Sequence, residues 1–211
     1  MKIGVLGAGN VGGTLGRRWA QQGHEVVFGV QDPQDPKLAD LLAQTEGRGR
    51  AATVAEAARF GEVVALTVPW SAVPDVLNAA GDLSGKILLD CTNPNFAAEP
   101  GGPASGHLNS GAEQIAALAP GARVVKAFNT TGWENMADPR YGSEVVTMLY
   151  AGDDPQAKSA VAQLAADLGF DAVDAGPLSF AHHLEALAQL WGQLAYGQKL
   201  GRNIAFRLLR R

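Results

Sequence analysis

Residues 1–12, MKIGVLGAGNVG, decide the fold of this chain. The apolar run 3–6 predicts a short buried strand. Gly7, Gly9 and Gly12 follow that strand directly, in the spacing G-x-G-x-x-G. In such a stretch the first glycine makes the tight turn out of the strand. The second lets a pyrophosphate approach the backbone, and the third lets the next helix pack closely on the strand.

A helix is expected directly after the glycines. Val11, Leu15 and Trp19 recur at four-residue spacing, which is typical of a helix face that packs on a sheet. The free N–H groups at the start of this helix, from Asn10 and Val11 onward, would face an anion, and the helix dipole favours negative charge there. Strand, turn and helix in this order indicate a dinucleotide site and argue against an ordinary glycine turn.

Composition limits the partners of the protein. The 211 residues are 46% apolar and 18% charged, as in a globular protein with a proper core. The net charge of −4 argues against nucleic acid or an anionic membrane as the main partner. No apolar run reaches the ~18 residues of a membrane span, and the first strand begins too early to leave room for a signal peptide. We therefore expect a cytoplasmic protein.

The single cysteine, Cys91, cannot form an internal disulfide, which fits a reducing compartment. No motif supplies this thiol with a base or a cation, so a buried core role is favoured over a reactive one.

Strand and helix patterns alternate along the rest of the chain. Strands are expected at 25–30, 62–68, 86–90, 123–128, 145–151 and 170–173, and helices at 37–44, 53–60, 73–80, 110–118, 156–168, 180–196 and 199–209, with a loop at 45–52. Two of these helices begin with capping boxes, at Thr53–Glu56 and Ser110–Glu113. The alternation predicts an α/β fold, a Rossmann-type doubly wound and mostly parallel sheet with a small C-terminal α/β extension. We place an NADP-binding domain at residues 1–132 and a small domain that completes the acceptor pocket at 133–211.

The end of the second strand should contact the adenosine ribose of the dinucleotide. An acid at this point favours NAD, and a nearby basic residue accommodates the 2′-phosphate of NADP. The chain offers Gln31 and Asp32, then Lys37. Two interpretations of Asp32 stay open, because it can hold a ribose diol or simply start the turn at Asp32-Pro33.

Ligands of open α/β sheets bind outside the carboxyl ends of the strands. Pro69-Trp70 and Asn93-Pro94 follow two such strands and should line the cofactor crevice. The quartet 129–132, Asn-Thr-Thr-Gly, follows a third strand and is either a ligand-facing turn or an ordinary turn. The Gly/Pro-rich stretch 95–109 is interpreted as a flap over the substrate with His107 at its rim. For His107 itself the sequence favours a solvated loop histidine, since nothing pairs it with a carboxylate.

Two features of the last third invite other interpretations. His182 and Glu185 lie three residues apart on one expected helix face, but no further clustered ligand accompanies them, so no metal site is expected. The arginines of the C-terminal tail are interpreted as solvated residues that cap a terminal helix, whose dipole favours cations there.

Several spaced motifs together resemble a known family. They are Gly7-Ala-Gly-Asn-Val-Gly12, Thr67-Val-Pro-Trp70, Asn93-Pro94, Val125-Lys-Ala-Phe-Asn-Thr130 and Gly176-Pro-Leu178. With the overall length, this set resembles the NADPH-dependent reductases of the deazaflavin coenzyme F420. The same domain type resembles the cytoplasmic part of the six-transmembrane ferric reductases, where a flavin takes the place of the deazaflavin.

The resemblance implies roles for individual residues. It places NADP, with NAD not excluded, against Gly7, Gly9, Asn10, Val11, Gly12, Gln31, Lys37, Val68, Pro69, Trp70, Asn93 and Pro94, and the deazaflavin, FMN or FAD against Asn129, Thr130, Thr131 and Leu178. Family members commonly carry Ser or Arg at the positions of Val30 and Gln31 to hold the 2′-phosphate. Both are absent here, so NADP is a preference that Lys37 would have to support.

The resulting hypothesis is hydride transfer between NADP(H) and a deazaflavin or flavin, which needs no side-chain acid or base. One alternative is an NADP-dependent hydroxy-acid dehydrogenase, because Lys199 and Asn203 have the spacing K-x-x-x-N and would share a helix face. A second alternative is a non-catalytic NADP(H) sensor. A homodimer is expected from the Ala-rich and Leu-rich terminal helices.

Overall fold

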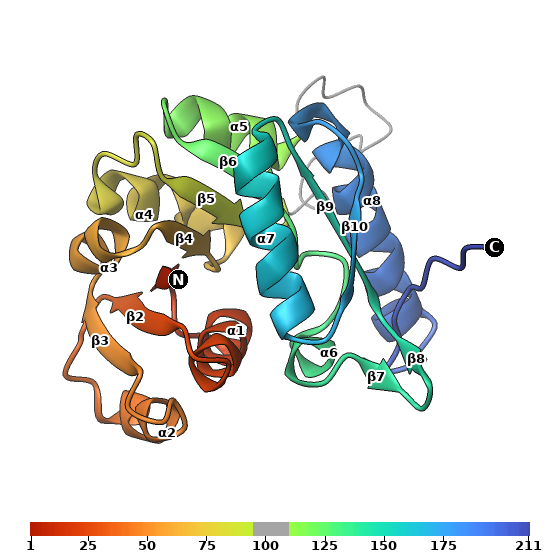
Figure 1. Cartoon of the computed structure of the whole chain (residues 1–211), viewed down its shortest axis with the longest axis horizontal. Coiled ribbons are helices and arrows are strands. Elements are labelled where there is room, and N and C mark those ends of the chain that lie inside the picture. Colours follow the sequence, from red (N-terminus) through yellow and green to blue (C-terminus); the bar gives the residue numbers. More distant parts are fainter. Residues whose placement is uncertain (95–109) are drawn as a thin grey trace.

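The computed structural model of the protein describes residues 1–94 and 110–211, so the predicted flap at 95–109 with His107 lies outside the described residues. Eight described strands form one sheet in the order β10-β9-β6-β5-β4-β1-β2-β3 (Figure 1). These strands are β1 (Lys2–Leu6), β2 (Glu25–Val30), β3 (Gly49–Thr53), β4 (Val63–Leu66), β5 (Ile87–Asp90), β6 (Arg123–Lys126), β9 (Thr147–Gly152) and β10 (Asp171–Asp174). The order 3-2-1-4-5-6 within it is that of doubly wound dinucleotide-binding folds, as predicted.

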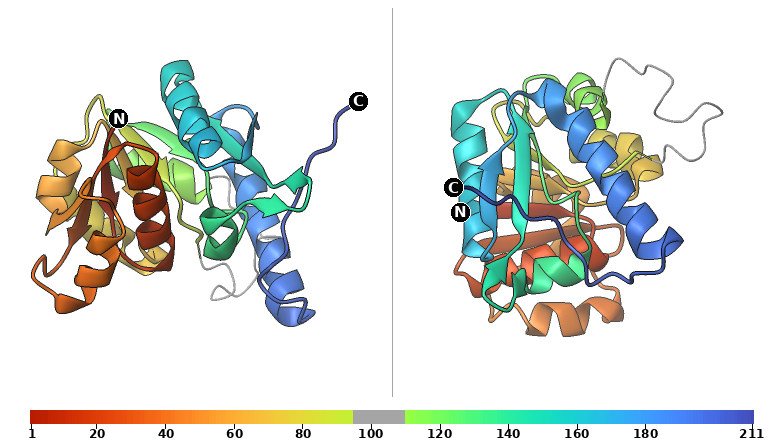
Figure 2. Two further views of the ribbon diagram at one scale, coloured as in Figure 1. Left: turned by 60° about the horizontal axis from the view of Figure 1, so that its bottom comes forward. Right: turned by 90° about the vertical axis from the view of Figure 1, so that its right-hand side faces the viewer.

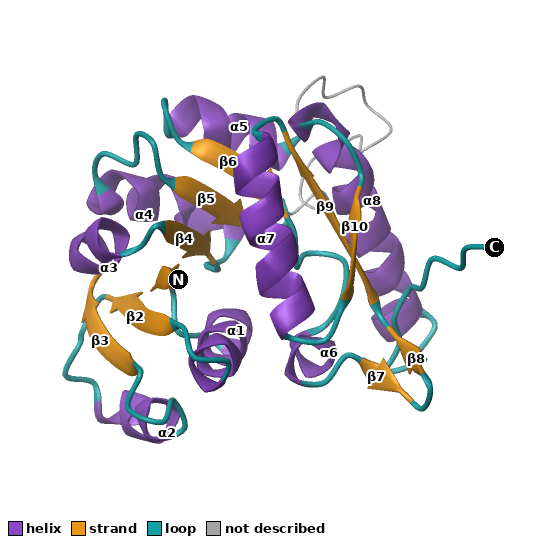
Figure 3. Ribbon diagram, in the orientation of Figure 1, coloured by secondary structure: helices purple, strands orange, loops and turns teal. Residues whose placement is uncertain are grey.

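Helices cover both faces of the sheet (Figure 3). They are α1 (Asn10–Gln21), α2 (Ala39–Ala43), α3 (Val54–Phe60), α4 (Val73–Ala80), α5 (Gly111–Leu118), α6 (Trp133–Ala137), α7 (Pro155–Asp167) and α8 (Ala181–Gly192), with short 3-10 turns at η1 (Pro36–Leu38), η2 (Trp70–Ala72) and η4 (Leu178–Phe180) and a π turn at η5 (Gln193–Gly197). Side chains of α1, α6 and α7 share one buried cluster, and side chains of α3, α4, α5 and α8 share the other. The sheet therefore lies between two helical layers.

Strand β4 shows how the sequence fills both layers. Val63 and Ala65 belong to the α1 side of the core, whereas Val64 and Leu66 belong to the α5 side. Successive strand side chains point to opposite faces, so a strand buried on both faces must be apolar at every position. This is the physical reason for the continuous apolar runs in the sequence.

The C-terminal part of the chain continues the same sheet. Strand β9 pairs antiparallel with β6, through Val125 with Gly152 and Lys126 with Ala151, and β10 then pairs parallel with β9. A separate hairpin of β7 (Arg140–Tyr141) and β8 (Glu144–Val145) lies beside this extension (Figure 2). The predicted extension is thus joined edge to edge to the dinucleotide-binding sheet.

Most predicted elements form within two residues of their expected bounds, and both capping boxes are present, at Thr53–Glu56 and Ser110–Glu113. The loop predicted at 45–52 is wrong in its second half. Residues Gly49–Thr53 form β3, which pairs in parallel with β2 at the sheet edge. Of its residues, GRAAT, only Thr53 is β-branched and none is aromatic, so pairing with β2 must stabilise the strand.

The helix predicted at 199–209 is wrong, because the chain after η5 forms neither a helix nor a strand. Lys199 and Gly201 have positive φ angles, 57° and 79°, which a right-handed helix does not allow. Lys199 and Asn203 therefore do not share a helix face. The dehydrogenase alternative loses the geometry on which it was based.

Ion pairs hold this C-terminal tail on the extension. Arg202 pairs with Glu134, Arg207 with Glu144 and Arg210 with Asp171. The Phe206 carbonyl accepts from the Thr147 N–H at 3.1 Å. Three of the four tail arginines thus bind carboxylates of the extension, and the prediction that the arginines cap a terminal helix is wrong.

A search of the helices within residues 1–94 and 110–211 finds none that combines the length and the apolar character needed to cross a membrane.

Candidate functional site

The glycine turn at the end of β1 has the geometry that the sequence predicts. Gly7 has a φ of 103°, which L side chains rarely adopt, and its N–H donates to the Gly29 carbonyl of β2 at 3.0 Å. A Cβ atom added at Gly12 would lie 2.1 Å from the Gly7 carbonyl oxygen. Only glycine lets α1 pack this closely on the turn.

The start of α1 is open. Its N-cap residue is Gly9, which offers no side chain to cap the helix, and the first turn carries no acidic residue. A Cβ atom added at Gly9 would meet nothing within 4 Å, and Gly9 and Asn10 are exposed. The first-turn N–H groups thus face open space, and the dipole favours an anion there. These residues fit the pyrophosphate of a dinucleotide.

Thr67, just past β4, stabilises the glycine turn by hydrogen bonds. Its hydroxyl is shared between the carbonyl oxygens of Leu6, at 2.8 Å, and Gly7, at 3.1 Å. Val68 also reaches the turn, since its side chain would lie 2.9 Å from a Cβ added at Gly7. The role of Thr67 cannot be predicted from the sequence, although Thr67 opens the Thr-Val-Pro-Trp motif. Of the two residues after Val68, Pro69 is exposed and Trp70 is half-buried on η2.

The three residues expected near the ribose lie on the surface after β2. The Asp32 carboxylate accepts from the Gln34 N–H at 2.9 Å, which is ordinary turn chemistry and supports the turn interpretation of this residue. Gln31 and Lys37 are exposed. The hydrogen bonds of the described residues include none between these two side chains.

Asn93 and Asn129 are brought together from the ends of β5 and β6. The Asn93 amide nitrogen donates to the Asn129 carbonyl, and the Asn129 amide nitrogen donates to the Asn93 side-chain oxygen, both at 3.0 Å. Asn129 is 4% exposed, and its Oδ1 has no partner among the described residues. A buried acceptor without a donor is costly, so this oxygen fits an N–H group of a ligand. Pro94, beside this pair, lies against Gly111.

Phe128 places Asn129 through an uncommon backbone conformation. Its φ is 59°, which costs a non-glycine residue about 1–3 kcal/mol. The buried ring packs edge-on against Trp19 and Phe170, and the Phe128 N–H donates to the Met148 sulfur at 3.1 Å. These contacts stabilise the strained conformation. No pattern in the sequence reveals it.

The residues expected to contact the acceptor lie in different surroundings. Thr130 is buried and lines a mostly apolar cavity of about 190 Å³, which Leu149, Leu187, Phe206 and Leu208 also line. Thr131 is also buried, and its hydroxyl accepts from the Asn135 amide at 2.7 Å. Leu178 belongs to the core cluster on the α5 side.

A fully buried ion cluster lies behind the Asn93–Asn129 pair. Lys126 on β6 donates through Nζ to Asp90 at 2.8 Å, to the Thr92 carbonyl at 2.6 Å and to Glu185 of α8 at 3.1 Å. All three charged side chains are 0% exposed. Thr92 immediately precedes Asn93, so Lys126 holds the loop that carries this predicted cofactor contact.

Other donors complete this cluster. The N–H groups of Gly111 and Ala112, at the start of α5, donate to Glu185, and Asp90 accepts from Thr92. Burial alone would lower the pKa of Lys126, but the charges and hydrogen bonds of Asp90 and Glu185 outweigh it and hold the pKa above its ordinary value. Lys126 is thus charged, and its role is not among the predictions from the sequence.

Cys91 has the bystander character expected from the sequence. Burial, followed by the nearby Asp90 carboxylate, raises the pKa of its thiol far above the ordinary value. A thiol of this kind is a poor nucleophile. Glu185 and His182, which share an expected helix face, point to different surroundings. The Glu185 side chain belongs to the buried ion cluster, whereas the His182 ring forms a hydrogen bond with the Ser179 carbonyl at the surface.

The fold and the glycine cradle define a dinucleotide-binding protein of the Rossmann class. The family model described as "NADP oxidoreductase coenzyme F420-dependent" matches residues 2–94. The F420-dependent NADP reductase of Methanothermobacter marburgensis is 32% identical over 222 residues, which cover 99% of this chain and 98% of that relative. The chain therefore belongs to the family of F420-dependent NADP oxidoreductases. The resemblance drawn from the spaced motifs is confirmed.

Two further relatives show how far the similarity extends. A crystal structure from Arthrobacter sp. FB24, provisionally assigned as an F420-dependent NADP reductase, is 33% identical, covers all of both chains and has a TM-score of 0.87. Rat metalloreductase STEAP3 is 33% identical over 192 residues, which are 88% of this chain but 36% of STEAP3. The chain thus spans about a third of that relative's length.

Proposed function

We propose that the protein transfers hydride between NADP(H) and a deazaflavin coenzyme of the F420 type, with a flavin as the alternative acceptor. The observation that carries the proposal is a pair of features at the carboxyl ends of the parallel strands. The start of α1 after β1 is open and uncapped, and the buried Oδ1 of Asn129 after β6 has no partner among the described residues. The first feature suits a pyrophosphate and the second suits an amide-bearing ring. The full-length similarity to the Methanothermobacter F420-dependent NADP reductase supports the choice of acceptor.

The chain's own residues bind and orient in this proposal. The first-turn N–H groups after Gly9 bind the pyrophosphate, and Asn129 offers Oδ1 to an N–H group of the nicotinamide amide. The apolar cavity beside Thr130 excludes water next to the acceptor ring. When the two coenzymes are bound, a hydride leaves C4 of the dihydronicotinamide for C5 of the deazaflavin or N5 of a flavin, and a ring nitrogen of the acceptor takes a proton from solvent.

Specificity for NADP over NAD is part of the proposal. Gln31 and Lys37 are exposed after β2, and neither repeats the Ser or Arg that family members commonly place there. We expect Lys37 to contact the 2′-phosphate. Lys37→Gln should weaken NADPH binding about tenfold and leave NADH binding unchanged, because only the phosphate contact is lost. Arg48→Gln, on the next loop, is the matched control.

Anaerobic stopped-flow tests the proposal. The purified protein is mixed with NADPH or NADH and, in separate runs, with deazaflavin, FMN or FAD, while oxidation of the nicotinamide is followed. Faster oxidation of NADPH by deazaflavin than by either flavin supports the proposed acceptor. Oxidation of NADPH by FMN or FAD, but not by deazaflavin, would identify a flavin as the hydride acceptor. Tight NADPH binding without oxidation by any acceptor would refute hydride transfer and favour the sensor alternative.

The variant Asn129→Leu tests whether Asn129 orients the nicotinamide ring. Asn129→Leu removes the oxygen that we assign to the nicotinamide amide, so turnover should fall by about tenfold or more, because a good hydrogen bond made in the transition state is worth ~1.4 kcal/mol or more. Asn203→Leu, in the exposed tail, is the control and should turn over like the wild type. Equal turnover of the two variants would remove Asn129 from the mechanism.

A further inference from the structure

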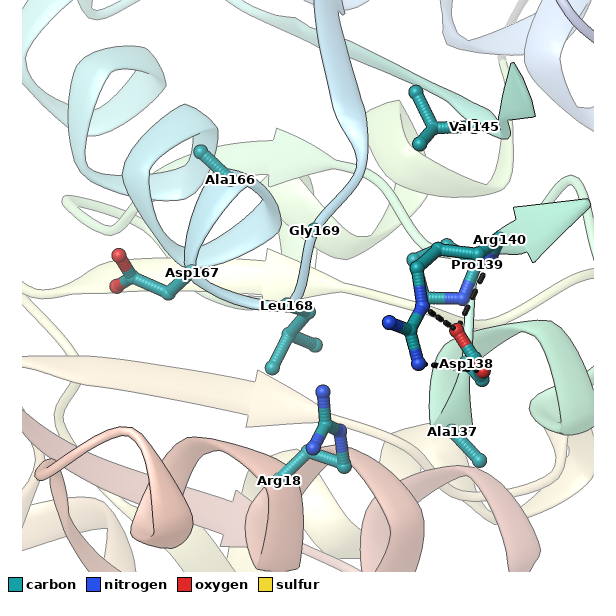
Figure 4. A pocket seen from close by; sticks show the side chains of 10 residues that line it. All are labelled: Arg18, Ala137, Asp138, Pro139, Arg140, Val145, Ala166, Asp167, Leu168 and Gly169. Carbon is teal, nitrogen blue, oxygen red and sulfur yellow. Dashed lines mark hydrogen bonds and ion pairs between the residues drawn. The ribbon is translucent and has the colours of Figure 1, made fainter. Parts of the chain in front are cut away.

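A second cavity lies apart from the glycine cradle, where α1 meets the C-terminal extension. It has a volume of about 380 Å³ and is lined by Arg18, Asp138, Arg140, Asp167, Leu168 and Gly169 among others. Figure 4 shows the Arg18 side chain rising from α1 toward Leu168, with the Arg140–Asp138 pair on the other side of the cavity. This volume falls within the range of roughly 300–1,000 Å³ typical of small-molecule sites, which favour such junctions.

The carboxylates around this cavity are already paired. Arg140 binds Asp138 through two nitrogens, at 2.8 and 3.0 Å, and His24 binds Asp167 at 2.9 Å. The hydrogen bond from Arg140, with a smaller effect of the Arg18 charge, lowers the pKa of Asp138. Asp138 therefore stays ionised and tied to Arg140. Neither carboxylate lies within ion-pair distance of Arg18.

Among the described residues that line this cavity, Arg140 is paired with Asp138, whereas Arg18 is a cation that forms no ion pair. Its Nε atom is buried and donates to no acceptor among the described residues, and Arg18 forms no ion pair with them. A guanidinium carries five N–H donors in a planar fork, and burying one of them unpaired costs free energy. A terminal nitrogen in water would need no partner, but a buried Nε does. The guanidinium that carries this Nε lines the cavity, so its remaining N–H groups can meet an acceptor there.

We propose that this cavity binds the oxyanion group of a small molecule, a phosphate or a carboxylate, with Arg18 as its main ligand. The planar fork of arginine matches two oxygens of either group. The donors of the fork would bind two oxygens of the ligand, and the exposed guanidinium of Arg140 adds positive charge at the rim. The site shares no residue with the glycine cradle, and the proposal does not depend on the identity of the hydride acceptor.

The position of the site gives binding a structural consequence. Arg18 belongs to the dinucleotide-binding part of the chain, whereas Asp138, Arg140 and Gly169 belong to the C-terminal extension. A bound oxyanion would therefore contact both parts across the junction. The oxyanion binds only when both parts of the chain line the cavity, so binding stabilises their native arrangement.

The Nε–Hε signal of Arg18 in a ¹⁵N-correlated NMR spectrum reports directly on the proposed contact. The signal is assigned by its absence from Arg18→Gln. Inorganic phosphate and acetate are titrated separately at constant ionic strength, with NADP present in excess so that the glycine cradle does not take up the anion. Arg17→Gln, the neighbouring arginine of the same helix, is the matched control. Arg18→Lys keeps the charge and removes the fork.

The expected result is a saturable shift of the Arg18 signal with half-saturation at or below about 1 mM for at least one of the two anions. Calorimetric binding should be retained in Arg17→Gln, weakened in Arg18→Lys and lost in Arg18→Gln. Response to phosphate alone or to acetate alone identifies the group that the natural ligand carries. A shift that fails to saturate with both anions, or equal binding by Arg17→Gln and Arg18→Gln, would overturn the proposal.

Discussion

Replacing Lys126 by methionine tests the buried ion cluster most directly. Methionine replaces the apolar stem of lysine but loses all three hydrogen bonds of Nζ, to Asp90, to the Thr92 carbonyl and to Glu185. Two fully buried carboxylates then face each other without the cation between them. Removing one partner of a buried ion pair destabilises a protein by about 3–5 kcal/mol.

This free energy converts into a measurable shift of the melting temperature. For a domain of 150–250 residues, 1 kcal/mol corresponds to about 2–4 °C, so Lys126→Met should melt roughly 6–20 °C below the wild type at pH 8. Lys158→Met is the control, because Lys158 pairs with the half-exposed Asp174 at the surface. A pair of that kind is worth about 1 kcal/mol or less.

The pH dependence distinguishes an ionic cluster from simple packing. In the wild type the pKa of Lys126 is raised, so its contribution is fully present below the ordinary lysine pKa and is lost only as the pH rises through the folded-state value. In Lys126→Met a buried carboxylate can instead take up a proton, so the loss of stability should be smaller at pH 5 than at pH 8. Thermal unfolding at both pH values measures this. A deficit equal to that of Lys158→Met, or one that does not change with pH, would refute the reasoning.

Three further predictions concern the cradle, the tail and assembly. Gly12→Ala should lower the free energy of unfolding by about 1–3 kcal/mol, because the new Cβ overlaps a carbonyl oxygen, whereas Gly9→Ala should unfold like the wild type but bind NADPH about tenfold more weakly in calorimetry. Burial raises the pKa of Glu134, but the hydrogen bond and the charge of Arg202 outweigh it and hold the pKa below its ordinary value. The tail should therefore be docked at pH values above the ordinary glutamate pKa and released as the pH falls through the folded-state pKa. Tail amides should then exchange hydrogen faster than they do at the same pH in Glu134→Gln. Leu190, exposed on α8, should lie in a homodimer interface, so Leu190→Glu should halve the mass in light scattering; an unchanged mass would argue against this interface.

Local patterns predict the dinucleotide-binding half of the chain well. Apolar periodicity finds β2 and β4, and the capping boxes at Thr53 and Ser110 mark true helix starts, because each of these signals depends on neighbours in the sequence. Strand β3 escapes detection because only one of its five residues, Thr53, favours a strand, and its conformation depends on pairing with β2. Elements that depend on neighbours in the sequence are thus predicted, whereas elements that depend on tertiary contacts are missed.

The candidate site shows this limit clearly. The glycines of the cradle can be predicted one by one, since their spacing encodes a turn. Asp90, Lys126 and Glu185 lie far apart in the sequence, and only the pairing of β5 with β6 and the packing of α8 bring them together. Asn129 follows from a motif, but its orientation depends on the positive φ of Phe128, which tertiary contacts stabilise. The tail is not a helix for a similar reason, because its conformation depends on contacts with distant residues, among them the ion pairs of Arg202, Arg207 and Arg210.

The C-terminal extension acts on the site through its contacts with β6. Met148 of β9 accepts the N–H of Phe128, and Glu185 of α8 completes the charge cluster around Lys126. The ring of Phe128 also packs on Phe170, so the core on this side of the sheet includes residues from before and after residue 132. The division at 132 therefore separates two stretches of sequence that share one core. The orientation of Asn129 in the dinucleotide-binding part depends on side chains that the extension supplies.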